Sequence, residues 1–166
     1  DEAEKYLAGL MEEKIGTIRD YVMTDSDVIN AIINSKLSEA SEKGIDVRAS
    51  VGREIGGTDE YGLSVALANL LDNAIEGCMR IHGERKMYFE MFVDGEYLKV
   101  FVKNTYDKSG IDLETRKENK KLHGFGVKSI KEFSEKNDGF VNFYEENDEF
   151  CANMWIIANK SCLFTS

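Results

Sequence analysis

The sequence contains no proline, few cysteines and no long apolar run. Because proline interrupts helices and strands more strongly than any other residue, its absence permits long, unbroken elements throughout the chain. The three cysteines, Cys78, Cys151 and Cys162, are far apart and form no C-x-x-C pair. This spacing excludes a disulfide framework and fits a reducing compartment. No segment reaches the roughly 18–20 apolar residues that span a bilayer, and no signal peptide is visible.

Positive charge is also scarce, since 21 Lys and Arg face 31 Asp and Glu and give a formal net charge of −10. This balance argues against a nucleic-acid binder that neutralises phosphates over its whole surface. The hydrophobic content of 42% and the aromatic content of 10% indicate a folded core. We therefore expect a soluble piece of a longer protein, with one domain or one domain plus a helix.

Four helices are predicted from apolar residues at steps of three or four. The first, over 2–22, could pack on its own domain or be the end of a longer dimerisation helix. The second, over 26–43, follows several capping residues and ends before Gly44, which suits a left-handed C-cap. Its inner face is expected to hold Val28, Ala31, Ile32, Ser35 and Leu37. The other two predicted helices cover 59–81 and 125–137.

Five strands are predicted from short apolar and β-branched segments bounded by turn residues. They cover 46–51, 86–93, 96–104, 140–145 and 149–157. Asp94-Gly95 is the strongest hairpin signal in the chain. The polar region 105–122 lacks periodicity and predicts a long loop, which inside a compact domain is usually functional. The order of elements predicts an α+β domain, with a mixed sheet and helices on one face.

The predicted helix over 59–81 presents polar side chains on one side. Asn69 and Asn73 are one turn apart, and Glu76 and Arg80 continue the same face. Asparagine forms helices poorly, so two on one face indicate that the carboxamides have a polar partner. One candidate is Mg²⁺, which prefers oxygen ligands. The alternative is an ordinary solvated face that tolerates two asparagines.

Two glycines, Gly124 and Gly126, open the predicted helix over 125–137. Free amides at a helix N-terminus attract anions, and glycine lets a phosphate approach the backbone. The surrounding segment 103–131 holds eight basic and four acidic residues, so it is net +4 in a chain that is otherwise −14. This contrast favours local recognition of phosphates. The alternative is a glycine-containing turn beside a solvated loop.

A third polar signal is Asn104, at the end of the predicted strand over 96–104. Its carboxamide can both accept a hydrogen bond from the edge of a base and donate one to it. The alternative is an asparagine that simply begins the following loop, which is common.

Together these elements resemble the GHKL ATPase superfamily. More narrowly, they resemble the ATP-binding domain of bacterial sensor histidine kinases, in the branch of Agr-type peptide-pheromone (quorum-sensing) sensors. The segment 69–76 is similar to the N box, and 123–130 is similar to the second glycine box. Residues 101–104 occupy the place of the first glycine box. The resemblance covers about residues 24–157, including the stretch 28–47.

The resemblance implies a Bergerat-type two-layer α/β sandwich, preceded by an N-terminal helix, that binds ATP and Mg²⁺. It implies that Asn73 coordinates the metal, that Asn69 supports the metal or its waters, and that Asn104 meets the adenine edge. These two helix residues, Asn69 and Asn73, are the implied catalytic residues. The glycine-box residues implied to hold the nucleotide are Gly124, Phe125, Gly126, Val127 and Lys128.

The implied function is that of a histidine protein kinase in a two-component signal-transduction system. It would transfer the γ-phosphoryl of Mg·ATP to a histidine outside this sequence, since neither His82 nor His123 lies on a long exposed helix. Residues 1–23 would end a dimerisation and phosphoacceptor helix, 24–160 would form the catalytic domain, and 161–166 a tail. The loop 105–122 would be the lid.

The resemblance also implies partners and a location. The expected partners are the phosphoacceptor segment of its own or a sister subunit and a response regulator, with a homodimer in the full protein. We expect no nucleic-acid contact and no membrane contact by this segment. The expected location is the cytoplasmic part of a membrane-bound sensor.

Three residues depart from the family pattern. Asn104 stands where the family usually has Asp, and the glycines that normally follow are missing, which predicts a hydrogen bond to adenine weaker by roughly 1 kcal/mol. Glu76 stands where many histidine kinases have Lys or Arg. Asn69 replaces the Glu that serves hydrolytic members as general base, which disfavours a chaperone-like ATPase. A degenerate, non-catalytic GHKL module that docks partners is the main alternative; an anti-sigma-type serine kinase is disfavoured by the upstream helix pattern.

Overall fold

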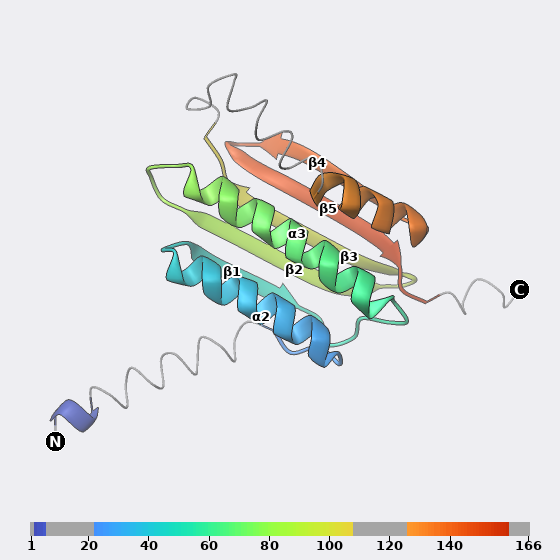
Figure 1. Cartoon of the computed structure of the whole chain (residues 1–166), viewed down its shortest axis with the longest axis horizontal. Coiled ribbons are helices and arrows are strands. Elements are labelled where there is room, and N and C mark those ends of the chain that lie inside the picture. Colours follow the sequence, from blue (N-terminus) through green and yellow to red (C-terminus); the bar gives the residue numbers. More distant parts are fainter. Residues whose placement is uncertain (1, 6–21, 108–125, 160–166) are drawn as a thin grey trace, which may run out of the picture.

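A computed structural model of the chain describes residues 2–5, 22–107 and 126–159. The labelled elements are α2 Asp27–Glu42, β1 Asp46–Val51, α3 Glu60–Met79, β2 Lys86–Asp94, β3 Tyr97–Thr105, β4 Phe140–Glu146 and β5 Glu149–Ile157. A further helix covers 126–136 and is the unlabelled orange ribbon of Figure 1. Residues 2–5 are helical as well. All five predicted strands are therefore present, with bounds within two residues of those expected.

The five strands form one mixed sheet in the order β1-β2-β3-β5-β4. Only β1 and β2 are parallel, and the other neighbouring pairs are antiparallel. Helices α2 and α3 and the helix over 126–136 all lie on the same face of this sheet (Figure 1). The predicted α+β sandwich, with a mixed sheet and helices on one face, is thus confirmed.

Local signals explain where the elements begin and end. The Ser26 side chain accepts a hydrogen bond from the amide of Ile29 and caps α2, and Asp59 caps α3 in the same way through Gly62. Gly44 follows α2 with a φ of 78°, in the left-handed region that glycine adopts without strain. The predicted hairpin between β2 and β3 is confirmed.

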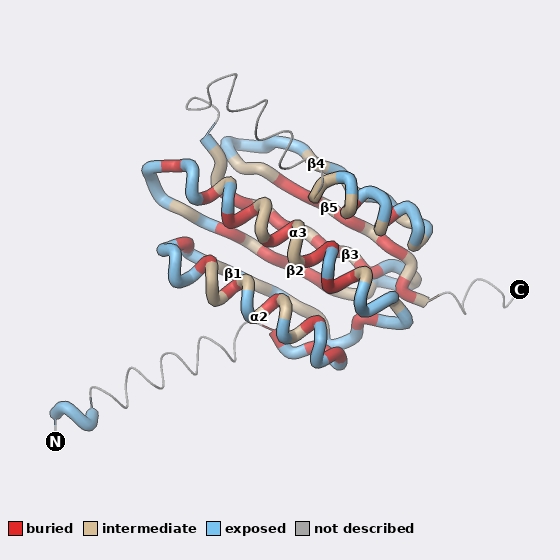
Figure 2. The backbone as a smooth tube through the Cα atoms, viewed as in Figure 1, coloured by how far each residue is buried: buried red, intermediate tan, exposed pale blue. Residues whose placement is uncertain are grey.

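The core lies between the sheet and the three helices. In β2 and β3 every second side chain is buried, and Figure 2 shows the buried residues along the middle of the sheet and on the inner sides of the helices. An apolar stripe of α3 is buried and consists of Leu63, Leu67, Leu70, Leu71 and Ala74. This stripe fixes which side of α3 remains available for a ligand.

The inner face predicted for α2 is correct for Leu37 and partly for Ile32, but wrong for the other three residues. The buried residues are Ile29, Ile33, Leu37 and Ala40. Val28 is about half exposed, and Ala31 and Ser35 are exposed. Apolar residues occupy two adjacent stripes of this helix, and the stripe with steps of four, four and three is the one that packs against α3 and β1.

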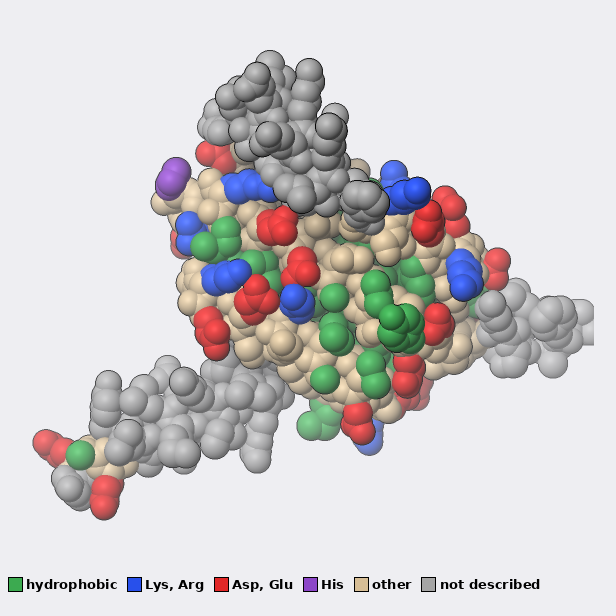
Figure 3. Space-filling view, viewed as in Figure 1, with side chains coloured by type: hydrophobic (Ala, Val, Ile, Leu, Met, Phe, Trp, Pro, Cys, Tyr) green, Lys and Arg blue, Asp and Glu red, His purple; other side chains and the backbone are tan. Residues whose placement is uncertain are grey.

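Several predictions fall outside the described residues: most of the helix over 2–22, most of the loop over 105–122, His123, and the tail 161–166. Within the described part of the chain, no helix is long and apolar enough to cross a membrane. Cys78 and Cys151 are both buried and free. Figure 3 shows the helix side of the molecule, where acidic and basic side chains are interspersed with apolar ones.

Candidate functional site

The structure brings together three of the predicted site residues. A Cβ atom at Gly126 would lie 3.8 Å from the Oδ1 atom of Asn73 and 4.0 Å from the Oδ1 atom of Asn69. The first described turn of the helix over 126–136 therefore faces the carboxamide side of α3. Two acceptor oxygens and the N-terminal part of a helix meet at one place, although the segments are far apart in the sequence.

The position of the two carboxamides follows from the core packing of α3. Each is followed by a buried residue, Leu70 or Ala74, that belongs to the apolar stripe. Asn69 and Asn73 are partly buried and lie at the border of that stripe, where side chains reach the gap between two helices. Glu76 and Arg80, which were expected on the same side, are exposed.

Asn104 lies on the helix-covered face of β3 and is buried, with 3% of its surface exposed. It is a residue of the strand, paired with Met87 and Phe150, and so it does not simply begin a loop. Its Nδ2 atom donates a hydrogen bond to the carbonyl oxygen of Thr105 at 3.0 Å. This bond fixes the carboxamide and leaves its Oδ1 oxygen as an acceptor.

Gly77 is a site residue that the sequence reasoning missed. A Cβ atom at this position would lie 2.5 Å from the Nδ2 atom of Asn104, so the carboxamide fits against α3 only because residue 77 has no side chain. Asn69, Asn73 and Gly77 follow each other at steps of four and so share one face of α3. A glycine inside a helix costs about 1 kcal/mol of helix stability relative to alanine. Glycine at such an unfavourable position is the feature of the sequence that indicates a packing requirement at residue 77.

The remaining glycine-box residues are only partly described, since Gly124 and Phe125 lie outside the described residues. Val127 is half-buried and Lys128 is exposed. The Lys128 ammonium is 3.9 Å from the Glu132 carboxylate on its own helix. Exposed pairs of this kind contribute little to stability, so the Lys128 ammonium can reorient towards an anion at low cost.

The negative charge of Asp72, which precedes Asn73 in the sequence, is partly balanced by a lysine of α2. The Lys36 ammonium lies 2.6 Å from the Asp72 carboxylate. The hydrogen bond to Asp72 raises the pKa of Lys36, although partial burial opposes the shift. The pair joins α2 to α3 and reduces the negative potential next to the candidate site.

The donor atoms at this site suit a hard cation that also binds a phosphate. Among residues 2–5, 22–107 and 126–159, no group of three or more His, Cys, Asp or Glu could hold a metal by itself. The Oδ1 oxygens of Asn69 and Asn73 are neutral oxygen ligands, the type Mg²⁺ accepts together with phosphate oxygens and water. The residues present therefore fit Mg²⁺ bound with a polyphosphate.

A family model for the GHKL domain matches residues 60–157, which is more than half of the chain. The chain belongs to the GHKL domain family. The matched range includes α3, with both carboxamides, and the helix over 126–136, so the site lies within the family domain. No curated protein sequence matches the chain.

Solved structures of histidine kinases share the fold of this GHKL domain. The catalytic domain of histidine kinase ThkA is 16% identical, covering 80% of this chain and 92% of that one, with a TM-score of 0.62. Acinetobacter baumannii histidine kinase AdeS is 12% identical, and the match covers 93% of this chain and 79% of that one, with a TM-score of 0.61. The mycobacterial sensor histidine kinase MprB is 15% identical, and the match covers 80% of this chain and 95% of that one, with a TM-score of 0.57. At these identities the comparison establishes the fold.

Proposed function

We propose that this GHKL domain binds Mg·ATP between α3 and the start of the helix over 126–136, and transfers the γ-phosphoryl to a histidine outside the sequence. The observation that supports this proposal most strongly is the approach of Gly126 to the Oδ1 atoms of Asn73 and Asn69. A helix N-terminus provides amides for phosphate oxygens, and the two carboxamides provide oxygens for the cation.

In this proposal Asn73 is the direct metal ligand and Asn69 holds the metal or its waters from one turn earlier. When bound, Mg²⁺ neutralises charge on the phosphates. Gly126, which has no side chain, lets a phosphate approach the helix backbone beside the two carboxamides. The backbone amides of residues 124–128 and the Lys128 ammonium contribute to phosphate binding.

The adenine end of the proposed site lies at Asn104. The amide nitrogen of Asn104 is held by Thr105 and faces Gly77, so its Oδ1 oxygen is the atom that accepts from the adenine amino group. A neutral carboxamide forms an ordinary hydrogen bond here, weaker than that of the carboxylate usual in the family. The remaining affinity then depends more heavily on the phosphate end of the site.

A kinase fits the residues of this site better than a hydrolase. Hydrolytic members of the family have a Glu at the position of Asn69, where it serves as general base. Asn69 cannot take a proton from water at neutral pH, so it cannot serve in this way. Phosphoryl transfer needs mainly positioning and charge neutralisation, which the carboxamides and the helix start can supply. His82 lies in the exposed segment after α3, so we place the acceptor histidine outside this sequence.

The wider context of the proposal is a two-component system. The names of the similar solved structures, including the sensor histidine kinase MprB, support this class. We place residues 1–23 at the end of a dimerisation and phosphoacceptor helix in a homodimer, 24–160 as the catalytic domain, and 161–166 as a tail. A response regulator would be the next partner. The Agr-type quorum-sensing branch, in a membrane-bound sensor, is supported by the resemblance of the segments 69–76 and 28–47.

Isothermal titration with a non-hydrolysable ATP analogue tests nucleotide binding, with and without Mg²⁺. We expect Mg²⁺-dependent binding that Asn73→Ala weakens by about 10–100-fold, because a ligand to a charged group is lost. The matched control is Asn142→Ala, which removes an exposed carboxamide from β4 and should bind like the natural chain. Absence of heat at millimolar ligand, or an unchanged affinity of Asn73→Ala, contradicts the proposal.

A second measurement separates the kinase from a degenerate binding module. The chain is mixed with radiolabelled ATP and with the preceding phosphoacceptor segment of the longer protein. Label on a histidine of that segment supports phosphoryl transfer. Nucleotide binding without any label would instead indicate a GHKL module that docks partners.

A further inference from the structure

Three aromatic side chains lie beside Asn104, on the face of the sheet that the helices cover. Phe150 is directly opposite Asn104 in the pairing of β3 and β5, and directly opposed residues point to the same face. The ring centroids of Phe150 and Phe143 are 6.2 Å apart with 21° between the ring planes, so these rings are stacked. The ring of Tyr106 is 6.0 Å from that of Phe150. Phe143, Phe150 and Tyr106 therefore form an aromatic cluster in which Phe150 is the middle member.

The hydrophobic core supports the aromatic cluster but does not cover it fully. Phe143 packs against the core, and all three rings of the cluster are only partly buried. Phe150 differs in this respect from the next residues on the same face of β5, which are buried: Ala152, Met154 and Ile156. A half-buried ring beside a buried carboxamide is the combination of apolar surface and polar group that small-molecule sites use.

The orientation of the Asn104 carboxamide brings a bound base next to this cluster. The Nδ2 atom donates to the carbonyl oxygen of Thr105 at 3.0 Å and faces Gly77, so the Oδ1 atom is the one that meets the amino group of adenine. The Cβ atoms of directly opposed residues in an antiparallel pair are about 4.5–5.5 Å apart. A purine is longer than this separation, so a base that is hydrogen-bonded to Asn104 lies within contact distance of the Phe150 ring.

We propose that Phe150 is the residue on which the adenine ring of ATP stacks. This inference rests on the proposed function, since it concerns the adenine end of the same nucleotide site. Removal of an aromatic ring that stacks on a base weakens binding by about 5–150-fold. The hydrogen bond from adenine to Asn104 is an ordinary one between neutral groups, so stacking is the larger contribution within the adenine end of the site.

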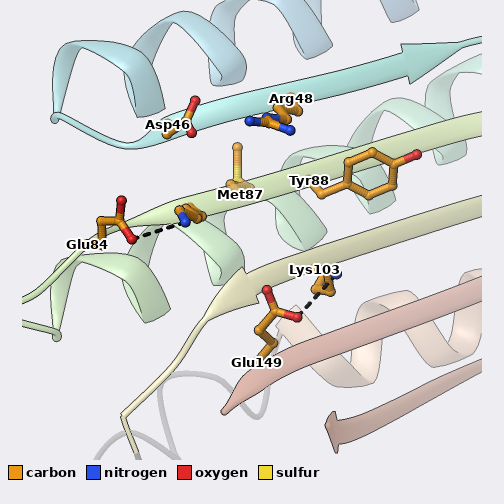
Figure 4. A pocket seen from close by; sticks show the side chains of 8 residues that line it. Asp46, Arg48, Glu84, Met87, Tyr88, Lys103 and Glu149 are labelled. Carbon is orange, nitrogen blue, oxygen red and sulfur yellow. Dashed lines mark ion pairs between the residues drawn. The ribbon is translucent and has the colours of Figure 1, made fainter. Parts of the chain in front are cut away.

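A pocket on the opposite face of the sheet is less suited to a base. This open pocket has a volume of about 420 Å³ (Figure 4). Lys86 pairs there with Glu84 at 3.0 Å, and Lys103 pairs with Glu149 at 3.1 Å. The one aromatic residue of the lining is Tyr88, whose hydroxyl donates to Glu90. The lining has three cations and three carboxylates, and the carboxylates repel phosphates: Arg48, Lys86, Lys103, Asp46, Glu84 and Glu149.

A comparison of two ligands tests the role of Phe150. The 166-residue chain is titrated in the presence of Mg²⁺ with a non-hydrolysable ATP analogue and, separately, with tripolyphosphate, which has no base. We expect Phe150→Ala to weaken binding of the ATP analogue by about 5–150-fold and to leave the affinity for tripolyphosphate unchanged. Asn73→Ala should weaken both ligands, because it acts at the phosphate end of the site. Normal binding of the ATP analogue by Phe150→Ala, or an equal loss for both ligands, overturns the inference on Phe150 alone.

Conservative variants separate stacking from a structural role of the same ring. Phe150→Tyr keeps an aromatic ring, and Phe150→Leu keeps an apolar side chain without one. We expect the first to bind the ATP analogue like the natural chain and the second to bind it as weakly as Phe150→Ala, with circular dichroism confirming that each variant is folded. The matched control is Phe140→Ala, which removes an exposed ring from the other face of the sheet and should bind both ligands normally.

The outcomes distinguish this inference from the proposed function. Normal binding of the ATP analogue by Phe150→Leu overturns the stacking role and leaves the proposed nucleotide site standing. A natural chain that binds neither the ATP analogue nor tripolyphosphate overturns both. If Phe150→Ala does not fold, the comparison of Phe150→Leu with Phe150→Tyr decides.

Discussion

At the residue scale, two glycines of the site lie next to carboxamides. Gly77 gives room to the amide of Asn104, and Gly126 lies next to the Oδ1 atoms of Asn69 and Asn73. The two positions differ in how tightly they are packed. A Cβ atom would be 2.5 Å from its neighbour at Gly77 but 3.8 Å at Gly126. Only the first position excludes a side chain for reasons of folding.

Gly77→Ala tests the close approach of α3 to Asn104. In an exposed helix this change would stabilise by about 1 kcal/mol, but here the methyl group displaces a buried carboxamide. We expect a net loss of about 1–3 kcal/mol in the free energy of unfolding, measured by urea denaturation. Gly83→Ala is the control, because a Cβ atom there meets nothing within 4 Å. A stabilised Gly77→Ala protein would show that the packing of Asn104 against α3 is wrong.

The carboxamides of α3 could be predicted from the sequence, but the role of Gly77 could not. Asn69 and Asn73 stand out because two poor helix formers share one face. The requirement at Gly77 arises from a strand that is distant in the sequence, so only the assembled sheet shows which side chain approaches it. The same holds for Asn104, whose burial depends on α3 covering the end of β3.

At the scale of elements, boundaries were easier to predict than orientations. Ser26, Asp59 and Gly44 mark helix ends through contacts within a few residues, so the sequence contains the whole signal. The face that α2 buries is a tertiary property. Its apolar residues form two adjacent stripes, and the position of β1 and α3 decides between them.

The link between α2 and α3 leads to a prediction on pH. Lys36 and Lys43 both contact Glu39, at 3.5 and 3.0 Å, but only Lys36 also binds Asp72 of α3. We expect Lys36→Met to lower the free energy of unfolding by about 0.5–1 kcal/mol more than Lys43→Met at neutral pH, because only the first change breaks a link between helices.

The pH dependence of this difference follows from the pKa shift. Pairing with Asp72 raises the pKa of Lys36 in the folded state. Its contribution is therefore complete below the unfolded pKa and is lost as the pH rises through the folded pKa. Urea denaturation should show that the difference in the free energy of unfolding between Lys36→Met and Lys43→Met becomes smaller above about pH 10.5. A gap that stays constant through this range would mean that the ion pair is not its cause.

At the scale of the whole molecule, the sheet separates two surfaces with different chemistry. On the helix side, carboxamides and a helix start meet around Gly126. On the helix-free side, aromatic rings and charged side chains of both signs cover the strands. The fold class followed from the order of elements, but the aromatic face did not, because in each strand the aromatic residues alternate with core residues that are equally apolar. Strand pairing was needed to assign each one to a side.

The proposed nucleotide site is tested most directly by locating where the nucleotide binds. Assigned ¹⁵N NMR spectra of the chain are recorded while Mg²⁺ and a non-hydrolysable ATP analogue are added. We expect the largest shifts at the side-chain amides of Asn69 and Asn73 and at the backbone amides of Gly77 and Gly126. Shifts concentrated instead around the pocket of Arg48 and Lys103, or no shifts at saturating ligand, would contradict the proposed site.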